Sequence, residues 1–170
     1  ISEGSTSVKD YGFEESVTEV ILPSTLKEIQ SNAFSSCTNL TNIVIPEGVQ
    51  TIGAGAFSGC LKMKNVVIPK SVTNIRADSF HSATIWLVYE NSYAHTFAEN
   101  NNLMYFVISG SEMPQEYVQG GITYYILNGE ANAVGYDSAV ADVVIPAEVD
   151  GYPVTSVKDI FNNSTTLKSI

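Results

Sequence analysis

Histidine and cysteine are the side chains that most often carry catalysis or bind transition metals, and this chain has two of each. His81 lies in a predicted turn and His95 on the polar side of a predicted helix, so both are expected to be solvated surface residues. The sequence holds no His-Glu-x-x-His pair, glycine-rich phosphate loop, nucleophile elbow or paired-cysteine zinc spacing. We therefore predict that the protein is not an enzyme and has no catalytic residues and no cofactor.

Aspartate supplies the oxygen ligands that calcium prefers, and several aspartates lie in the last third of the chain. Their spacing lacks the alternating ligand positions of a calcium-binding loop. We expect no metal site at these residues, which are Asp137, Asp142, Asp150 and Asp159.

Cys37 and Cys60 occupy the same position in two adjacent copies of a repeat described below. Stacked copies would lie near the spacing of neighbouring strands, about 4.8 Å, which is within the Cα range of a disulfide. A bridge is therefore geometrically possible. The simpler interpretation is that both are small buried thiols that fill the core, as free cysteine often does.

Composition excludes several classes of partner. The net charge is −10 and there are only eight Lys and Arg residues, which argues against binding to nucleic acid or to an anionic membrane surface. A basic partner is permitted but not implied. The longest apolar run, 85–89, is far too short to span a membrane, and no signal peptide opens the chain.

The elements that must position these residues follow from a repeat of 23 residues. Residues 40–62 align without a gap with residues 17–39 and 63–85. Such a period is the signature of a solenoid, in which no single repeat can bury its apolar side without its neighbours. The aligned positions are Pro23, Pro46 and Pro69, and the apolar columns Val20, Ile43, Val66; Leu22, Ile45, Ile68; Leu26, Val49, Val72; Ile29, Ile52, Ile75; and Phe34, Phe57, Phe80.

Within one repeat, the residue types predict two short extended pieces and a turn. Side chains at 42–45 are expected to point alternately in and out, and residues 43–45 are β-branched, which favours a strand with Ile43 and Ile45 inward. Pro46 ends that strand because it lacks an amide donor, and a second extended piece follows at 49–52. Residues 53–57 are small and compact, which favours a helical or 3₁₀ turn that directs Phe57 under the sheet.

The repeat pattern I-x-I-P-x-x-V-x-x-I-x-x-x-A-F-x-x-C resembles the BspA-type leucine-rich repeat of bacterial cell-surface proteins, over residues 17–85 and again from Val140. The resemblance implies a leucine-rich-repeat solenoid, β-rich α/β in class, with a short strand and a turn or 3₁₀ segment per repeat. It also implies an extracellular, adhesive or scaffolding role without catalytic residues. Ser79 and Ala83 depart from the pattern, which we interpret as the array approaching its end.

The repeat divides the chain into two predicted arrays. The cap of the first is expected to hold a short helix with Ser92 as its N-cap, followed by a strand. A β-hairpin turning at Asn128-Gly129 is expected to open the second. The predicted segments are a first array at 1–110, with a partial repeat at 1–16, repeats at 17–39, 40–62 and 63–85 and a cap at 86–108; a linker at 111–121; and the hairpin cap and truncated second array at 122–170.

The two ends of the chain fall inside repeats, so we interpret it as a fragment of a longer protein. Ile170 has the repeat phase of Ile43, and Ile1 has that of Ile45. These complementary phases suggest head-to-tail self-association, in which one copy stacks on the next. The alternative is a monomer with frayed ends.

Outward-facing strand positions are the candidate binding surface, since solenoids often bind ligands on their strands. One column is polar and the next is β-branched, which suits an extracellular or host protein or a peptide. The alternative is that the β-branched column only stabilises the sheet through cross-strand contacts. The two columns are Glu19, Asn42 and Asn65, and Ile21, Val44 and Val67.

Aromatic residues suggest a second function, a carbohydrate-binding surface, because aromatic rings stack on sugar rings. A third is a structural spacer that displays other domains. The aromatic candidates for glycan binding are Trp86, Tyr89, Tyr124, Tyr125, Tyr136 and Tyr152.

Overall fold

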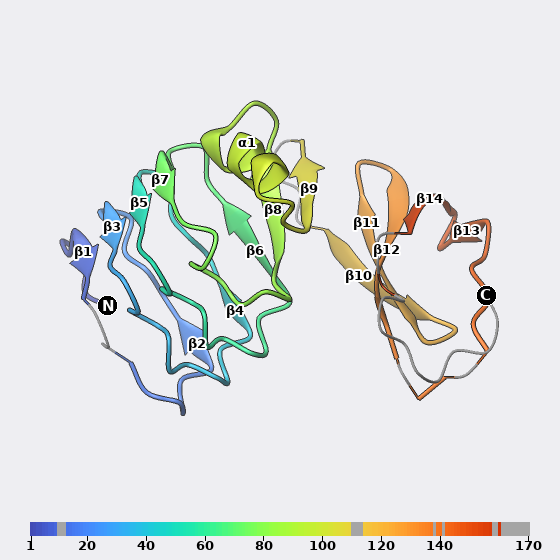
Figure 1. Cartoon of the computed structure of the whole chain (residues 1–170), viewed down its shortest axis with the longest axis horizontal. Helices are drawn as coiled ribbons and strands as arrows, with labels where there is room; N and C mark the ends of the chain where they lie inside the picture. Colours follow the sequence, from blue (N-terminus) through green and yellow to red (C-terminus); the bar gives the residue numbers. More distant parts are fainter. Residues whose placement is uncertain (10–12, 110–113, 138, 141, 158–159, 161–170) are drawn as a thin grey trace. The chain divides into compact units, whose positions relative to one another are not determined.

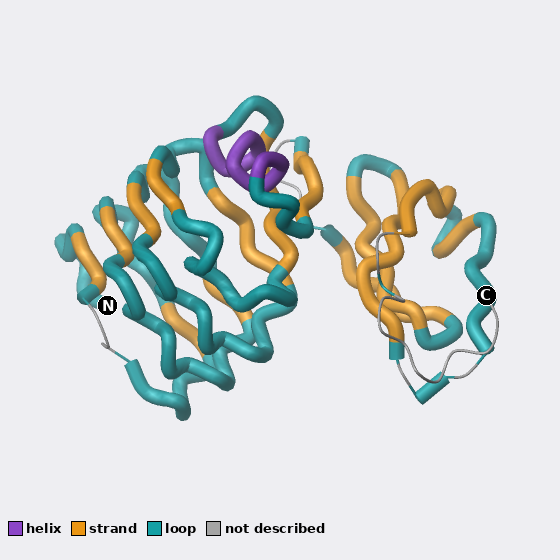
Figure 2. The backbone as a smooth tube through the Cα atoms, viewed as in Figure 1, coloured by secondary structure: helices purple, strands orange, loops and turns teal. Residues whose placement is uncertain are grey.

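The computed structural model describes residues 1–9, 13–109, 114–137, 139–140, 142–157 and 160. The chain divides into two compact units, Ile1–Val107 and Ile108–Ile170. In the first unit, short strands joined by turns and loops wind into successive coils (Figure 1, Figure 2). The predicted leucine-rich-repeat solenoid is confirmed.

One parallel ladder takes a short strand from each successive coil. Its members, in order, are β1 (Ser7–Val8), β3 (Glu28–Ile29), β5 (Thr51–Ile52) and β7 (Asn74–Ile75). Thr51 pairs with Glu28 on one side and with Asn74 on the other, each 23 residues away. The sequence period therefore sets the register of the coils.

A second set of strands lies across the interior from this ladder (Figure 1). The strands β2 (Glu19–Val20) and β4 (Asn42–Ile43) form a parallel pair. Further along, β6 (Asn65–Ile68) pairs in parallel with β8 (Ile85–Tyr89), which neighbours β9 (Tyr105–Ile108). The strand expected at 42–45 is thus shorter than predicted, although Ile43 and Ile45 are both buried as expected.

The interior is built from the predicted apolar columns. Phe34, Phe57 and Phe80 stack face to face, with ring centroids 5.0 Å apart at both steps, and Phe13 extends the stack at 4.7 Å from Phe34. The turns that carry Phe34 and Phe57 also bond to the next coil: Phe34 N donates to Ala56 O at 2.8 Å, and Phe57 N donates to Ser79 O at 2.6 Å. The predicted inward Phe57 is confirmed, and it lies on an i→i+3 bonded turn.

Ser79, the departure from the alanine column, is fully buried and satisfied. Its hydroxyl donates to Gly53 O at 3.0 Å and accepts from Arg76 N at 3.1 Å. A polar atom placed in the core costs free energy unless it is hydrogen-bonded, and here it bridges two coils. The serine therefore adds a cross-coil bond where alanine would add only packing.

The helix α1 (Tyr93–Asn100) begins at Ser92, whose hydroxyl accepts from His95 N at 3.1 Å as predicted for the N-cap. Trp86 links this helix to the array, because its ring meets Phe80 edge-on at 5.3 Å and stacks on Phe97 at 6.1 Å. Aromatic contacts thus continue from the repeat core into the segment predicted as the cap.

The second unit is organised around the predicted hairpin. Strands β11 (Ile122–Leu127) and β12 (Glu130–Tyr136) pair antiparallel through Asn128 and Gly129. Both turn residues have positive φ, 53° and 79°, as a type I′ turn requires. Beyond β12 lie β14 (Tyr152–Val157), parallel to it, and β13 (Glu148–Val149), antiparallel to β14.

The linker expected at 111–121 is wrong for residues 115–119, which form β10 (Gln115–Gln119) at the edge of this sheet, antiparallel to β11. The glycines that suggested a linker make its turn instead. Gly120 and Gly121 both have positive φ, 59° and 79°, and they fold the chain back so that Gln119 pairs with Ile122.

Residues 161–170 lie outside the described residues, and so do Asp159 and residues 110–113. The start of a further strand at 167–170 and the stacking of Ile170 on Ile1 of another copy therefore stay predictions.

Candidate functional site

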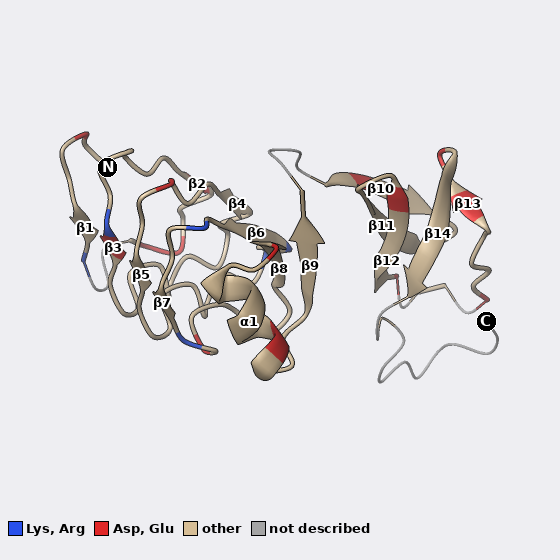
Figure 3. Ribbon diagram, turned by 90° about the horizontal axis from the view of Figure 1, so that it is seen from above, with Lys and Arg blue, Asp and Glu red and all other residues tan. Residues whose placement is uncertain are grey.

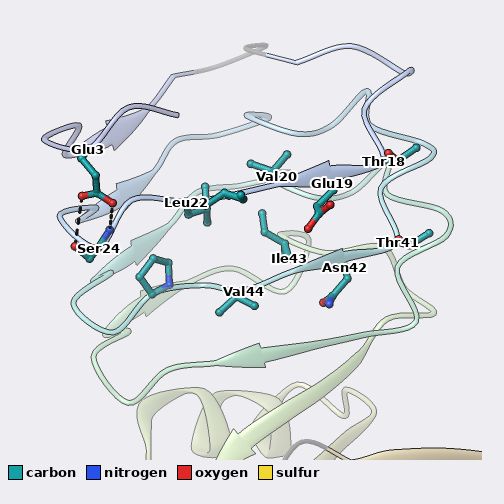
Figure 4. A pocket seen from close by; sticks show the side chains of 12 residues that line it. Glu3, Thr18, Glu19, Val20, Leu22, Ser24, Thr41, Asn42, Ile43 and Val44 are labelled. Carbon is teal, nitrogen blue, oxygen red and sulfur yellow. Dashed lines mark hydrogen bonds between the residues drawn. The ribbon is translucent and has the colours of Figure 1, made fainter.

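A groove of about 710 Å³ lies along β2 and β4 (Figure 4). Both strands line it, through residues 18–22 and 41–44, and Glu3, Ser24 and Pro46 complete it. Four of the six residues predicted as the binding surface lie here: Glu19, Ile21, Asn42 and Val44.

The strand pairing sets the alternation along this groove. Glu19 pairs with Asn42, and Val20 pairs with Ile43. Ile43 is 4% exposed and faces the core, whereas Glu19 and Asn42 are exposed. Because side chains alternate along an extended chain, the next outward residue is Ile21, directly after β2.

Ile21 and its counterpart Val44 are 77% and 70% exposed. They form a small exposed apolar surface at one repeat position of two neighbouring coils.

The other two predicted residues, Asn65 and Val67, lie on β6 and are only half-buried rather than fully exposed. Neither lines the groove. Val67 pairs with Leu87 of β8, which is completely buried. Exposure along the β-branched column therefore falls toward the cap, and the open part of the column is confined to the first two members.

Glu3 and Ser24 also line the groove, and neither was predicted. Ser24 donates to the Glu3 carboxylate from its backbone N and from its hydroxyl, both at 3.4 Å (Figure 4). The two residues share one repeat position on consecutive coils, so the repeat alignment contained the signal for this pairing.

The exposed β-branched position recurs in the second unit. Val144 follows the buried Val143 and is 78% exposed, the same contrast that Val44 makes with Ile43. In the predicted alignment with the first array, Val144 has the repeat phase of Val44. Exposure at this position is thus a property shared by both units.

The aromatic surface predicted for glycans is contradicted for three of its members. Trp86 is 2% exposed, Tyr124 is fully buried and Tyr125 is 2% exposed, because hairpin and cap use them as core. Tyr89 is half-buried beneath Lys70 Nζ, 5.1 Å from its ring centroid. Tyr136 is half-buried and donates to Val140 O at 3.0 Å, and Tyr152 is 37% exposed. The six aromatics do not form a shared platform of exposed rings.

The histidines serve local structure. His81 Nδ1 accepts from Ala83 N, and His95 Nδ1 accepts from Asn91 N, both at 3.3 Å. The His95 ring also packs 5.3 Å from that of Tyr105. Both are half-buried rather than fully solvated as expected.

Cys37 and Cys60 are free thiols in the core, and Cys60 Sγ donates to Phe34 O at 3.3 Å. Burial raises the pKa of Cys37, and burial together with the neighbouring Cys37 raises the pKa of Cys60 to about 12. A thiol held protonated in this way is a poor nucleophile and a poor metal ligand. Among the described residues, no group of three or more His, Cys, Asp or Glu is arranged to hold a metal ion.

The family model for the BspA type leucine rich repeat region matches residues 1–101 of the chain, in six copies. Comparison with curated proteins and with solved structures gives no significant match. In the part of the chain that the structure describes, no helix is long and apolar enough to cross a membrane.

Proposed function

Since the chain belongs to the BspA-type leucine-rich-repeat family, we propose that it is a non-catalytic adhesion module whose partner protein binds in the groove along β2 and β4. The family supports a repeat-based protein-interaction module. Its members are typically found on bacterial surfaces, and we extend that location to this protein.

One observation carries the proposal. Ile21 and Val44 are exposed in a groove of about 710 Å³, directly after two paired strands, β2 and β4, whose inward side chains pack in the core. Burying aliphatic surface contributes roughly 25 cal/mol per Å² of favourable free energy, so covering these two side chains would favour association. A rigid scaffold also means that little ordering cost opposes binding.

The proposal is tested by selecting ligands from a phage-displayed peptide library on the whole chain and retitrating the selected peptides against variants. Ile21→Lys combined with Val44→Lys should weaken binding at least tenfold, because it removes the apolar contact and introduces charge. Thr51→Lys combined with Asn74→Lys, on β5 and β7, is the matched control, since it adds two lysines to the other ladder. Selected peptides that bind the double variant and wild type equally well would refute the proposal.

A further inference from the structure

The side chain of Glu19 lines the groove, and its carboxylate is not used by the fold. Among the described residues, no hydrogen bond or ion pair engages its carboxylate, and Asn42, its partner across the strands, also has a free amide side chain. Glu3, by contrast, is held by Ser24. None of the described lining residues is Lys or Arg.

The surrounding charge has the same sign. The chain carries eighteen acidic residues against eight Lys and Arg, and the basic residues are few and scattered along the ribbon (Figure 3). A groove with two carboxylates in an acidic protein attracts cations and repels acidic ligands.

The spacing of the groove side chains suits one kind of ligand side chain. Glu19 and Ile21 are two residues apart on an extended segment, which separates them by roughly 6.5–7 Å. The same separation holds for Asn42 and Val44. Arginine joins an apolar stem to a planar cationic head, so its stem can cover the aliphatic pair while its head reaches the carboxylate. Its fork of N–H donors also matches a carboxylate bidentately and leaves a donor for an amide oxygen.

Resting on the proposed function, we propose that this groove recognises an arginine-bearing segment of the partner protein. The arginine stem packs on Ile21 and Val44, and its guanidinium donates to the Glu19 carboxylate and to Asn42 Oδ1. Glu19 thereby selects for charge, while the aliphatic pair supplies the non-polar contact.

The test uses the whole chain and three fluorescein-labelled, end-capped peptides of sequence Gly-Val-Xaa-Val-Xaa-Val-Gly. Xaa is arginine, citrulline, which keeps the shape without the charge, or glutamate. In fluorescence anisotropy titrations the arginine peptide should bind about fivefold more tightly than the citrulline peptide, and the glutamate peptide most weakly. The arginine preference should shrink as salt is raised, because the ion pair is solvent-accessible.

Two variants with the same charge change locate the effect. Glu19→Gln should abolish the preference for arginine over citrulline. Glu28→Gln, which removes an exposed carboxylate from β3 on the other ladder, should preserve it. An equal loss in both variants would show diffuse attraction to an acidic protein and would overturn the inference.

Other outcomes separate this inference from the proposed function. If arginine and citrulline peptides bind equally, and Val44→Lys weakens both, the groove is a docking site but Glu19 does not select arginine. If none of the three peptides binds, arginine recognition is refuted, while library-selected ligands still decide the role of the groove.

Discussion

The two strand ladders of the first unit share one interior but present different surfaces. Along β3, β5 and β7 the outward residue of each strand is polar, and none of the described residues of these strands is a large exposed hydrophobic. Along β2 and β4 the outward polar residues are followed by Ile21 and Val44, exposed at 77% and 70%. The polar series on the first ladder is Glu28, Thr51 and Asn74.

This difference separates the residues that the repeat needs for its core from those that it presents to solvent. The inward residues of both ladders are alike from coil to coil, because each must fill the same column of the core. Outward residues are free of that constraint, so an apolar pair on one ladder alone requires another explanation. Binding is the explanation that we propose, and the variants below test it against a purely structural role.

The largest effect is expected from Phe57→Ala, which removes the ring between Phe34 and Phe80 in the stack. Truncating a fully buried phenylalanine costs about 3–5 kcal/mol of unfolding free energy. Leu61→Ala, at a 61% exposed side chain, should cost less than about 0.5 kcal/mol. Urea denaturation followed by circular dichroism measures both. Similar losses for the two variants would contradict the stacked interior.

Gly59→Ala is expected to push two coils apart. A Cβ at Gly59 would lie 1.7 Å from the Ser35 backbone oxygen of the preceding coil. Backbone cannot move aside as a flexible side chain can, so we expect a loss of about 1–3 kcal/mol, in the range of overpacked cores. Ser36→Ala, at the same position one coil earlier, is the control and should be nearly neutral. A stable Gly59→Ala variant would show that the coils are spaced more loosely.

Alkaline pH should lower the unfolding free energy, by less than the two substitutions above. The pKa of Cys60 is raised from 9.0 to about 12 in the folded chain. As pH rises above 9.0 the unfolded chain loses this proton first, so the unfolding free energy should fall between pH 9.0 and about 12 and be unaffected by this group below 9.0. Urea titrations across that range should show a smaller decline in a Cys37→Ala, Cys60→Ala double variant. An equal decline would assign the effect to other groups.

The smallest effect on stability is expected from changing the exposed pair that distinguishes the two ladders. Replacing Ile21 and Val44 together by threonine keeps β-branching but removes apolar surface. If the pair serves binding, the unfolding free energy should stay within about 0.5 kcal/mol of wild type. Cross-strand stabilisation predicts a loss of about 1 kcal/mol or more for the two residues. Thermal denaturation of the double variant distinguishes these outcomes.

The sequence predicted the coils well because the 23-residue spacing and the similar apolar residues at each position impose the same geometry on every repeat. Phe57 and Ile43 are buried for that reason, and the Asn128-Gly129 turn formed because few residue pairs accept positive φ twice. At these positions the local residue types were sufficient to predict the structure.

Features that depend on distant packing escaped prediction. Val67 has the same repeat phase as Val44, yet it pairs with the buried Leu87 and lies outside the groove. Trp86 was expected at the surface, but the array's last phenylalanine and α1 enclose it. The strand β10 was not predicted because Gly120 and Gly121 were interpreted as part of a linker. Whether such glycines form a turn or a linker depends on whether a partner strand is present.

The chain has a single tryptophan, and its ring touches both Phe80 and Phe97. Indole emission shifts to longer wavelength when water reaches the ring. The fluorescence of Trp86 therefore reports on the junction between Phe80 and α1. A shift of its emission would reveal loosening there without an added label.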